Sequence, residues 1–273
     1  MTQRTIYVTQ AVKPEQRSKA YWVLSDCIVL ITRSLKHIFK NTDQLLGLTI
    51  QPVMFMMLFR YVFGGAINTG GTTYVNFLVA GILVQSLAFG SLTTSLSVAT
   101  DLQKGIIDRI KSLPIASWAL LMGHVVADIF RNSIQSVVMI GAGFLVGFRP
   151  EASASDWFAI AGIVLVFTFA MSWVAAILGL LAKSVETVQW LGFFIVFPLT
   201  FASAAFAPTE SMPKFLKLFA ENQPVTHVIE AIRALMIGTP IGSHGIIAVT
   251  WCIAIICIAI PMATYLFRKH SGR

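Results

Sequence analysis

The stretch FPLTFASAAFAPTESMPKFLKLFAENQPVTHVIEAIRAL, residues 197–235, decides the architecture of this chain. It begins as the end of an apolar helix that contains Pro198, then becomes half polar, and only after it does a last apolar run begin. In a bilayer, backbone that leaves regular helix must be buried in protein or line a water-filled cavity, because hydrocarbon offers no hydrogen-bonding partners. The stretch therefore predicts a membrane protein with a specialised segment between two of its helices.

The composition of the chain also predicts a membrane protein. Its 273 residues are 56% hydrophobic and only 12% charged, with a mean hydropathy of +0.77. A soluble domain carries about 25% charged residues. The three cysteines form no CxxC pair, and we interpret them as packing residues rather than redox or metal groups. We expect no signal peptide, because the first apolar run begins only at Leu45 and has no cleavage pattern.

Six apolar runs are candidate membrane spans, since a helix needs about 20 residues to cross the hydrocarbon. The third is too long for one crossing, so we expect residues 118–128 to extend beyond the hydrocarbon. The sequence thus predicts an all-α integral membrane protein with six transmembrane helices in residues 44–268, between an N-terminal segment, 1–43, and a tail, 269–273. The predicted spans are 45–64, 75–99, 118–148, 157–182, 188–206 and 245–267.

Lysine and arginine are distributed unevenly between the two sides of this predicted topology. Cytoplasmic loops carry an excess of both residues. One side holds 14, namely Arg4, Lys13, Arg17, Lys19, Arg33, Lys36, Lys40, Lys104, Arg109, Lys111, Lys183, Arg268, Lys269 and Arg273. The other side holds four, namely Arg149, Lys214, Lys217 and Arg233. We therefore predict that both termini are cytoplasmic, and we explain the net charge of +8 by topology rather than by nucleic-acid binding.

Two short segments on the predicted cytoplasmic side have a mixed polar and apolar character. Residues 25–42 predict an amphipathic interface helix, which either anchors the first span or contacts a partner. Residues 100–115 predict a short helix that Pro114 ends. That segment is either a surface for a cytoplasmic partner or a solvated loop. Its charged residues include Lys104, Asp108, Arg109 and Lys111.

Three ionisable residues share one face of the third predicted span, at spacings of four and three. They are His124, Asp128 and Arg131. Ionisable groups at membrane depth are functional candidates by default. Asp128 and Arg131 can nevertheless form an ion pair across one helical turn. We interpret them as a pair that braces the helix rather than as a proton relay.

The polar half of the opening stretch predicts two short amphipathic helices. Ser211 is expected to cap the first helix, and Pro224 is expected to start the second, which Gly238 ends. Glu230 and Arg233 are expected on the polar face of the second helix. Two such helices are too short to span, so they predict a pair that lies in the outer leaflet or enters it and returns.

Motifs for nucleotide binding and catalysis are absent from the sequence. It contains no GxxxxGK[ST], HExxH or GxSxG motif. No paired intramembrane carboxylates indicate ion coupling. We therefore expect that the chain is not an enzyme, and that it has no catalytic, cofactor-binding or metal-binding residues.

Five segments, spread over most of the chain in a fixed order, carry a family resemblance. They are QPVMFMMLFRYVFGG at 51–65, GIIDRIKSLPIA at 105–116, DIFRN at 128–132, FPLTFASAAFAPTESMP at 197–213 and ENQPVTHVIEAIRALMIG at 221–238. With these segments the chain resembles the permease subunits of type-2 ABC exporters, in the daunorubicin-resistance-like branch. The last two segments are the most specific.

The resemblance implies two permeases, either two copies of this chain or this chain with a sister chain, and two separate ATPase subunits that bind ATP and magnesium. It implies six membrane helices, an interface helix, and a re-entrant pair that forms an outer gate. It also implies a helix that couples the permease to the ATPase. The coupling residues would be Asp101, Lys104, Gly105, Asp108, Arg109 and Lys111. The gate residues would be Pro198, Pro208, Pro213, Pro224, Glu230 and Arg233.

The expected function is ATP-driven export of a drug, antibiotic or other amphipathic compound across a bacterial inner membrane, with membrane lipid and the ATPase as partners. Two alternatives stay open from the sequence. The exported compound could be a lipid or a glycan, or the chain could be a membrane assembly or regulatory protein that transports nothing.

Overall fold

The structure is a computed structural model, which describes residues 31–32, 42–65, 67, 73–106, 117–182 and 184–269. Within this part of the chain all regular structure is helical, without a strand, so the predicted all-α fold is confirmed there. The helices are α2 (Thr42–Leu58), the π-helix η1 (Phe59–Phe63), α3 (Tyr74–Gln103), α5 (Ser117–Val146), α6 (Ala154–Leu181), α7 (Val185–Phe201), the 3-10 helix η2 (Thr209–Ser211), α8 (Lys214–Asn222), α9 (Pro224–Ile237) and α10 (His244–Lys269).

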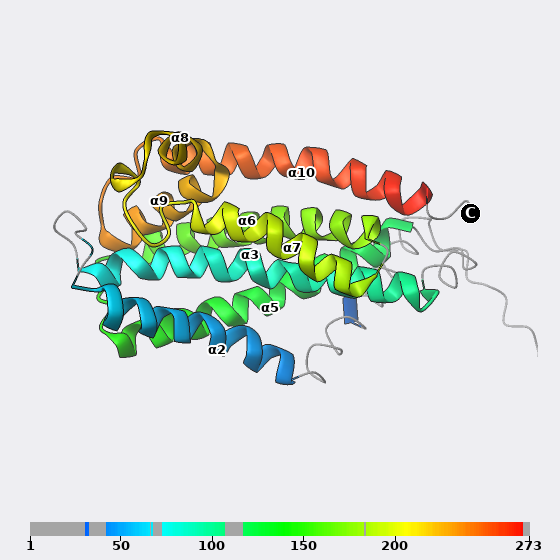
Figure 1. The fold of residues 1–273 in the computed structure, drawn as a ribbon, viewed down its shortest axis with the longest axis horizontal. Helices are drawn as coiled ribbons and strands as arrows, with labels where there is room; N and C mark the ends of the chain where they lie inside the picture. Colours follow the sequence, from blue (N-terminus) through cyan, green and yellow to red (C-terminus); the bar gives the residue numbers. More distant parts are fainter. Residues whose placement is uncertain are drawn as a thin grey trace, which may run out of the picture.

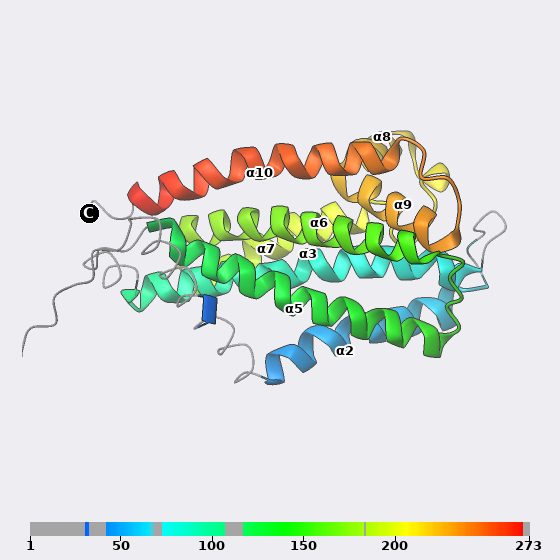
Figure 2. The same cartoon turned by 180° about the vertical axis from the view of Figure 1, so that it is seen from behind.

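The long helices form an elongated bundle (Figure 1). α3 packs against α2, α5, α6, α7 and α9, while α10 packs along α6 (Figure 2). α8 and α9 lie at one end of the bundle, which we call the cap end. The end of α10 lies at the opposite end, which we call the base end (Figure 1). Helices α2, α5 and α7 run toward the cap end, whereas α3, α6 and α10 run away from it.

Six apolar helices lie at the positions of the six predicted spans, but their lengths differ. Four of them, α3, α5, α6 and α10, are long and apolar enough to cross a membrane, by length and composition. The apolar stretch of α2 and η1 and the whole of α7 are shorter apolar helices. Among the described residues the structure therefore supports four candidate spans, and the count of six stays a prediction.

The helix at the fifth predicted span, 188–206, ends at Phe201, before the predicted end of the span, and the bounds of the span stay a prediction. Just beyond this point the Ser203 hydroxyl accepts a hydrogen bond from the backbone N–H of Ala205, at 3.2 Å. A local bond from a side chain to the backbone offers the chain an alternative to the helical ladder. Residues 202–206 accordingly form turns rather than a further helical turn.

Two glycines allow backbone to approach α3 closely. A side chain at Gly81 would collide with the backbone of Ala205, so this glycine admits the turn that follows α7. A side chain at Gly179 of α6 would lie 2.5 Å from the backbone oxygen of Ser95. In a bilayer, small residues at such crossings allow van der Waals packing that larger side chains prevent.

Arg233 fastens α9 to the rest of the bundle. Its side chain donates hydrogen bonds to the backbone oxygens of Phe77 in α3 and Ala204 in the turn, and to the Glu230 carboxylate. Its guanidinium carbon lies 3.5 Å from the centre of the Phe77 ring. The prediction that Arg233 lies on a polar face is wrong, because the residue is 5% exposed. Two backbone carbonyl groups and the Glu230 carboxylate therefore pair with its guanidinium group.

The starts and ends of the two short helices match the sequence only in part. α9 begins at Pro224 and ends at Gly238, whose φ of +75° favours glycine, as predicted. The predicted cap of the first short helix is wrong. Ser211 ends η2, and Pro213 precedes α8 without a side-chain cap. A proline at this position restricts the chain without supplying a hydrogen-bonding oxygen.

Candidate functional site

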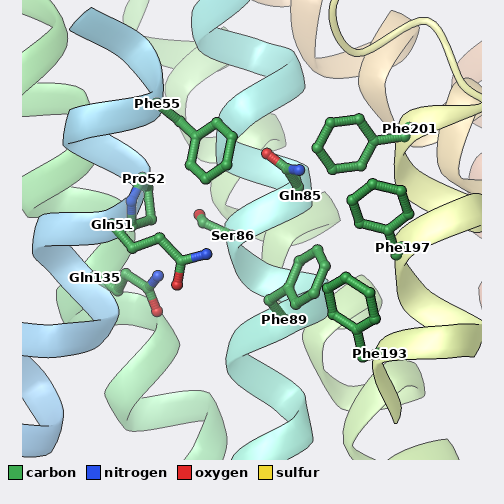
Figure 3. A pocket seen from close by; sticks show the side chains of 10 residues that line it. All are labelled: Gln51, Pro52, Phe55, Gln85, Ser86, Phe89, Gln135, Phe193, Phe197 and Phe201. Carbon is green, nitrogen blue, oxygen red and sulfur yellow. The ribbon is translucent and has the colours of Figure 1, made fainter. Parts of the chain in front are cut away.

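A cavity of about 280 Å³ lies between α2, α3, α5 and α7 (Figure 3). We call it the pocket. α7 supplies only phenylalanine rings, whereas the glutamines come from α2, α3 and α5 (Figure 3). The lining residues are Gln51, Pro52, Phe55, Gln85, Ser86, Phe89, Gln135, Phe193, Phe197 and Phe201.

The aromatic wall of the pocket is a ladder along α7. Phe193, Phe197 and Phe201 recur every four residues, a spacing that places side chains on one face of a helix. Their ring centroids are 4.9 and 4.1 Å apart. The ladder continues toward the cap end, where Phe206 stacks on Phe59 at 4.5 Å. Phe193 is 44% exposed and Phe197 38%, so this wall opens to the outside of the single chain.

The opposite side of the pocket is polar but carries no charge. Gln85 and Gln135 are buried, and Gln51 lies near Gln135 (Figure 3). An amide both donates and accepts hydrogen bonds. Ligand sites combine apolar and aromatic walls with a few polar groups that orient the ligand. The pocket therefore suits a compound with a flat apolar body and neutral hydrogen-bonding groups.

A line of polar contacts between α3 and α5 runs from the pocket toward the base end, and we call it the polar seam. It comprises Gly90 beside Asn132, Thr93 beside Asp128, and Asp101 beside His124. The Asp101 carboxylate lies 3.1 Å from His124 Nε2. These contacts lie between the pocket and the base end of α3, and they join side chains of two antiparallel helices.

Asp128 is the centre of the seam and is fully buried. It forms an ion pair with Arg131 one turn along α5. It also accepts hydrogen bonds from Ser172 of α6 and, at 3.4 Å, from Thr93 of α3. The pair predicted to brace one helix therefore joins three helices.

The family model described as "ABC-2 type transporter" matches residues 25–237. The match spans the pocket, the polar seam and the cap end. The chain belongs to the ABC-2 type transporter family. Membership implies an ABC transporter with an ATPase partner, and identifies the chain as a transport permease and a multi-pass membrane protein.

Several relatives extend over most of the permease. It is 29% identical to the daunorubicin resistance ABC transporter permease protein DrrB1 of Streptomyces coeruleorubidus, over 84% of this chain and 81% of that protein. It is 25% identical to the probable doxorubicin resistance ABC transporter permease protein DrrC of Mycobacterium tuberculosis, over 96% of this chain and 95% of that protein. It is 23% identical to the inner membrane transport permease YadH of Escherichia coli, over 69% of this chain and 75% of that protein.

The predicted coupling residues are described only in part. Asp101 is buried at the end of α3 and faces His124, so it is turned into the permease rather than outward. Lys104 is exposed, and Gly105 ends the turn after α3 with a φ of +63°. Outside the described residues lie Asp108, Arg109, Lys111 and nearly all of the predicted interface helix, 25–42.

The predicted gate residues do not form one cluster along the chain. Pro198 lies inside α7, Pro208 precedes η2, and Pro213 precedes α8. Pro224 is the first residue of α9. The structure pairs only Glu230 and Arg233 directly, and Arg233 ties this helix to the turn after α7.

Sequence reasoning missed the pocket, although its residues left a signal. Gln51, Gln85 and Gln135 are polar residues within three of the predicted spans, and polar residues within membrane helices are costly and often functional. The four-residue spacing of Phe193, Phe197 and Phe201 marks one face of α7. No local pattern shows that these faces meet, because they belong to four helices.

Proposed function

We propose that this permease is the membrane-spanning subunit of an ATP-driven exporter of amphipathic compounds, energised by a separate ATPase that binds ATP and magnesium. The observation that carries the proposal is the pocket, with its phenylalanine ladder on α7 and its uncharged glutamines on three other helices. Such a site can bind a flat apolar compound by stacking and can form hydrogen bonds with polar groups at the edge of that compound. It offers no cation to a phosphorylated lipid or glycan.

The names of two relatives support this class of compound. Daunorubicin and doxorubicin resistance are attributes of those proteins. The two compounds share a flat aromatic body with polar substituents, which is the shape that the pocket suits. We extend the likeness to this permease as a proposal about the chemical class.

We propose the bacterial inner membrane as the location, with six spans and both termini cytoplasmic. α2 and α7 then serve as spans with η1 and the turns after α7 at their outer ends. The ladder opens away from the bundle, and α2 and η1 carry exposed Met54 and Tyr61, respectively. Lipid or a second permease, either a copy or a sister chain, would cover these faces.

Coupling would begin at the base end. The segment from Asp101 to Lys111 would dock on the ATPase, and the interface helix would contact it as well. Asp101 and His124 fix the end of α3 to α5. A displacement of the docked segment would therefore move α3 and α5 together, and these helices carry three of the pocket's four amide and hydroxyl groups.

The test is ATP-dependent transport of daunorubicin by the permease and its copurified ATPase in sealed vesicles. Phe197→Ala removes the central ring of the ladder. Loss of an aromatic contact of about 0.5–1.5 kcal/mol lowers apparent affinity roughly 2- to 13-fold. Phe158→Ala is the matched control, because Phe158 is 81% exposed on α6 and lies outside the pocket. Equal transport by both variants, or failure of an ATPase to copurify, would refute the proposal.

A further inference from the structure

We propose that Asn132 and Gln135 of α5 form a hydrogen-bonding subsite at the base end of the pocket, which accepts an N–H or O–H donor of the bound compound. The inference rests on the proposed function and names the feature of the compound that the permease selects. The observation behind it is a fully buried amide, Asn132, whose two polar atoms have no hydrogen-bond partner within the described part of the chain.

Buried side-chain amides in proteins nearly always have partners, so an exception calls for an explanation. Asn132 lies one turn from Gln135 on the same helix, and Gln135 lines the pocket. The two amides converge on one point of α3. A side chain added at Gly90 would collide with Asn132 Oδ1 and would lie 3.2 Å from Gln135 Oε1. Gly90 thus lets the Asn132 amide oxygen lie directly against the α3 backbone, beside the amide oxygen of Gln135.

The neighbours of this subsite favour a neutral polar group rather than an anion. The two carboxamide oxygens that lie beside Gly90 are acceptors, and hydroxyl or amine groups are their complement. The nearest carboxylate, Asp128, is already engaged by Arg131 and Ser172. The subsite therefore contributes hydrogen bonding without net charge.

The position of the subsite fits the shape of the pocket. Ser86 and Gln85 of α3 line the pocket one turn from Gly90, and the ladder of α7 lies across from them (Figure 3). A flat compound stacked on Phe193 and Phe197 would direct one edge toward α5. A donor on that edge would reach Gln135 first, with Asn132 beside it.

The experiment measures binding rather than transport. Two fluorescent probes share one flat neutral ring: 7-amino-4-methylcoumarin carries an N–H donor, and 7-dimethylamino-4-methylcoumarin does not. Each is titrated into the full-length permease in phosphatidylcholine nanodiscs, with empty nanodiscs subtracted. Asn132→Leu replaces the amide by an apolar group of similar shape. We expect the amino probe to bind roughly 3- to 10-fold more weakly, the loss of one net hydrogen bond, and the dimethylamino probe to be unchanged.

Two further variants separate recognition from packing. Gly90→Ala places a methyl group against the Asn132 amide and displaces it, so this variant should weaken the amino probe selectively as well. Ser136→Ala is the control, because within the described part of the chain the Ser136 hydroxyl donates to the backbone oxygen of Asn132, one turn earlier in its own helix. We expect it to change neither probe.

The outcomes are distinguishable. Equal weakening of both probes in Asn132→Leu, or no weakening of either, would overturn the subsite while leaving the pocket intact. Failure of both probes to bind the wild-type permease would overturn the pocket as a site for flat compounds, and the subsite with it. Selective weakening in both Asn132→Leu and Gly90→Ala supports the proposal.

Discussion

The buried ion pair of Asp128 and Arg131 gives the sharpest test of how the bundle is held together. The side chain of Asp128 is inaccessible and that of Arg131 is 8% exposed. Each charge is acceptable at this depth mainly because the other is present. Removing one partner of a buried ion pair leaves an uncompensated charge and costs about 3–5 kcal/mol, whereas replacing both by apolar groups is often neutral. We therefore expect Asp128→Leu and Arg131→Met each to destabilise the permease by about 3–5 kcal/mol.

The double variant should be more stable than either single variant, for a reason visible in the structure. The hydroxyl groups that contact Asp128 have other acceptors: Ser172 also donates to the Thr168 backbone oxygen at 2.7 Å, and Thr93 to the Gly90 backbone oxygen at 2.7 Å. Neither hydroxyl is left without an acceptor when Asp128 is replaced. The double variant therefore creates no unsatisfied group at these positions.

The assay is unfolding by sodium dodecyl sulfate in mixed micelles, followed by near-ultraviolet circular dichroism, for the wild type, the two single variants and the double variant. Ser136→Ala, on the same helix, serves as the control for a substitution that removes only a local bond. Additive destabilisation, with the double variant the least stable, would show that the two charges are stabilised independently and would refute the reasoning.

Two further predictions concern the cap end. Gly81→Ala should destabilise the permease by about 1–3 kcal/mol in the same assay, because the new methyl group meets the Ala205 backbone. The control is Gly162→Ala in α6, where no atom lies near the added methyl group, and this variant should be neutral or stabilising by up to about 1 kcal/mol. Equal effects of the two substitutions on stability would contradict the close packing at Gly81. Burial and the facing His244, whose Nδ1 lies 3.0 Å from that of His227, lower the pKa of His227. The folded state then binds a proton less readily than the unfolded chain, so stability should be constant above the ordinary histidine pKa of about 6.5 and fall as the pH decreases below it. His244→Gln should flatten the dependence of the melting temperature on pH between 7 and 5, and an unchanged slope would exclude the pair as its source.

Local patterns in the sequence predicted those features that depend on one helix. Runs of apolar residues located six helices, because the thickness of the hydrocarbon fixes the length of a span. The spacing of Asp128 and Arg131 predicted their ion pair, because residues three apart share a face of an α-helix, and the structure contains this pair. Pro224 and Gly238 marked the ends of α9 because their backbone preferences are intrinsic.

Features that depend on contacts between distant segments could not be predicted in this way. From the sequence, Arg233 is interpreted as a surface residue, because it lies one turn from Glu230. In the structure it donates a hydrogen bond to the backbone oxygen of Phe77, which is 156 residues away in the chain. Asn132 reads as one polar residue in an apolar helix, and only the approach of Gly90 shows where its amide points. Both cases need the packing of α3 against another helix, which no periodicity within one helix encodes.

The stretch 197–235 connects the pocket with the cap end through covalent continuity and two specific contacts. Phe197 and Phe201 belong to the ladder, and the turn that follows them delivers Phe206 to stack on Phe59. Arg233 holds that same turn through the Ala204 carbonyl. A displacement of α9 that broke this bond would release the turn and with it the ring at the cap end of the ladder. Gly81 lets the turn lie directly on α3, so packing against this helix holds the turn as well. We therefore predict that a displacement of α9 reaches the aromatic wall through this turn.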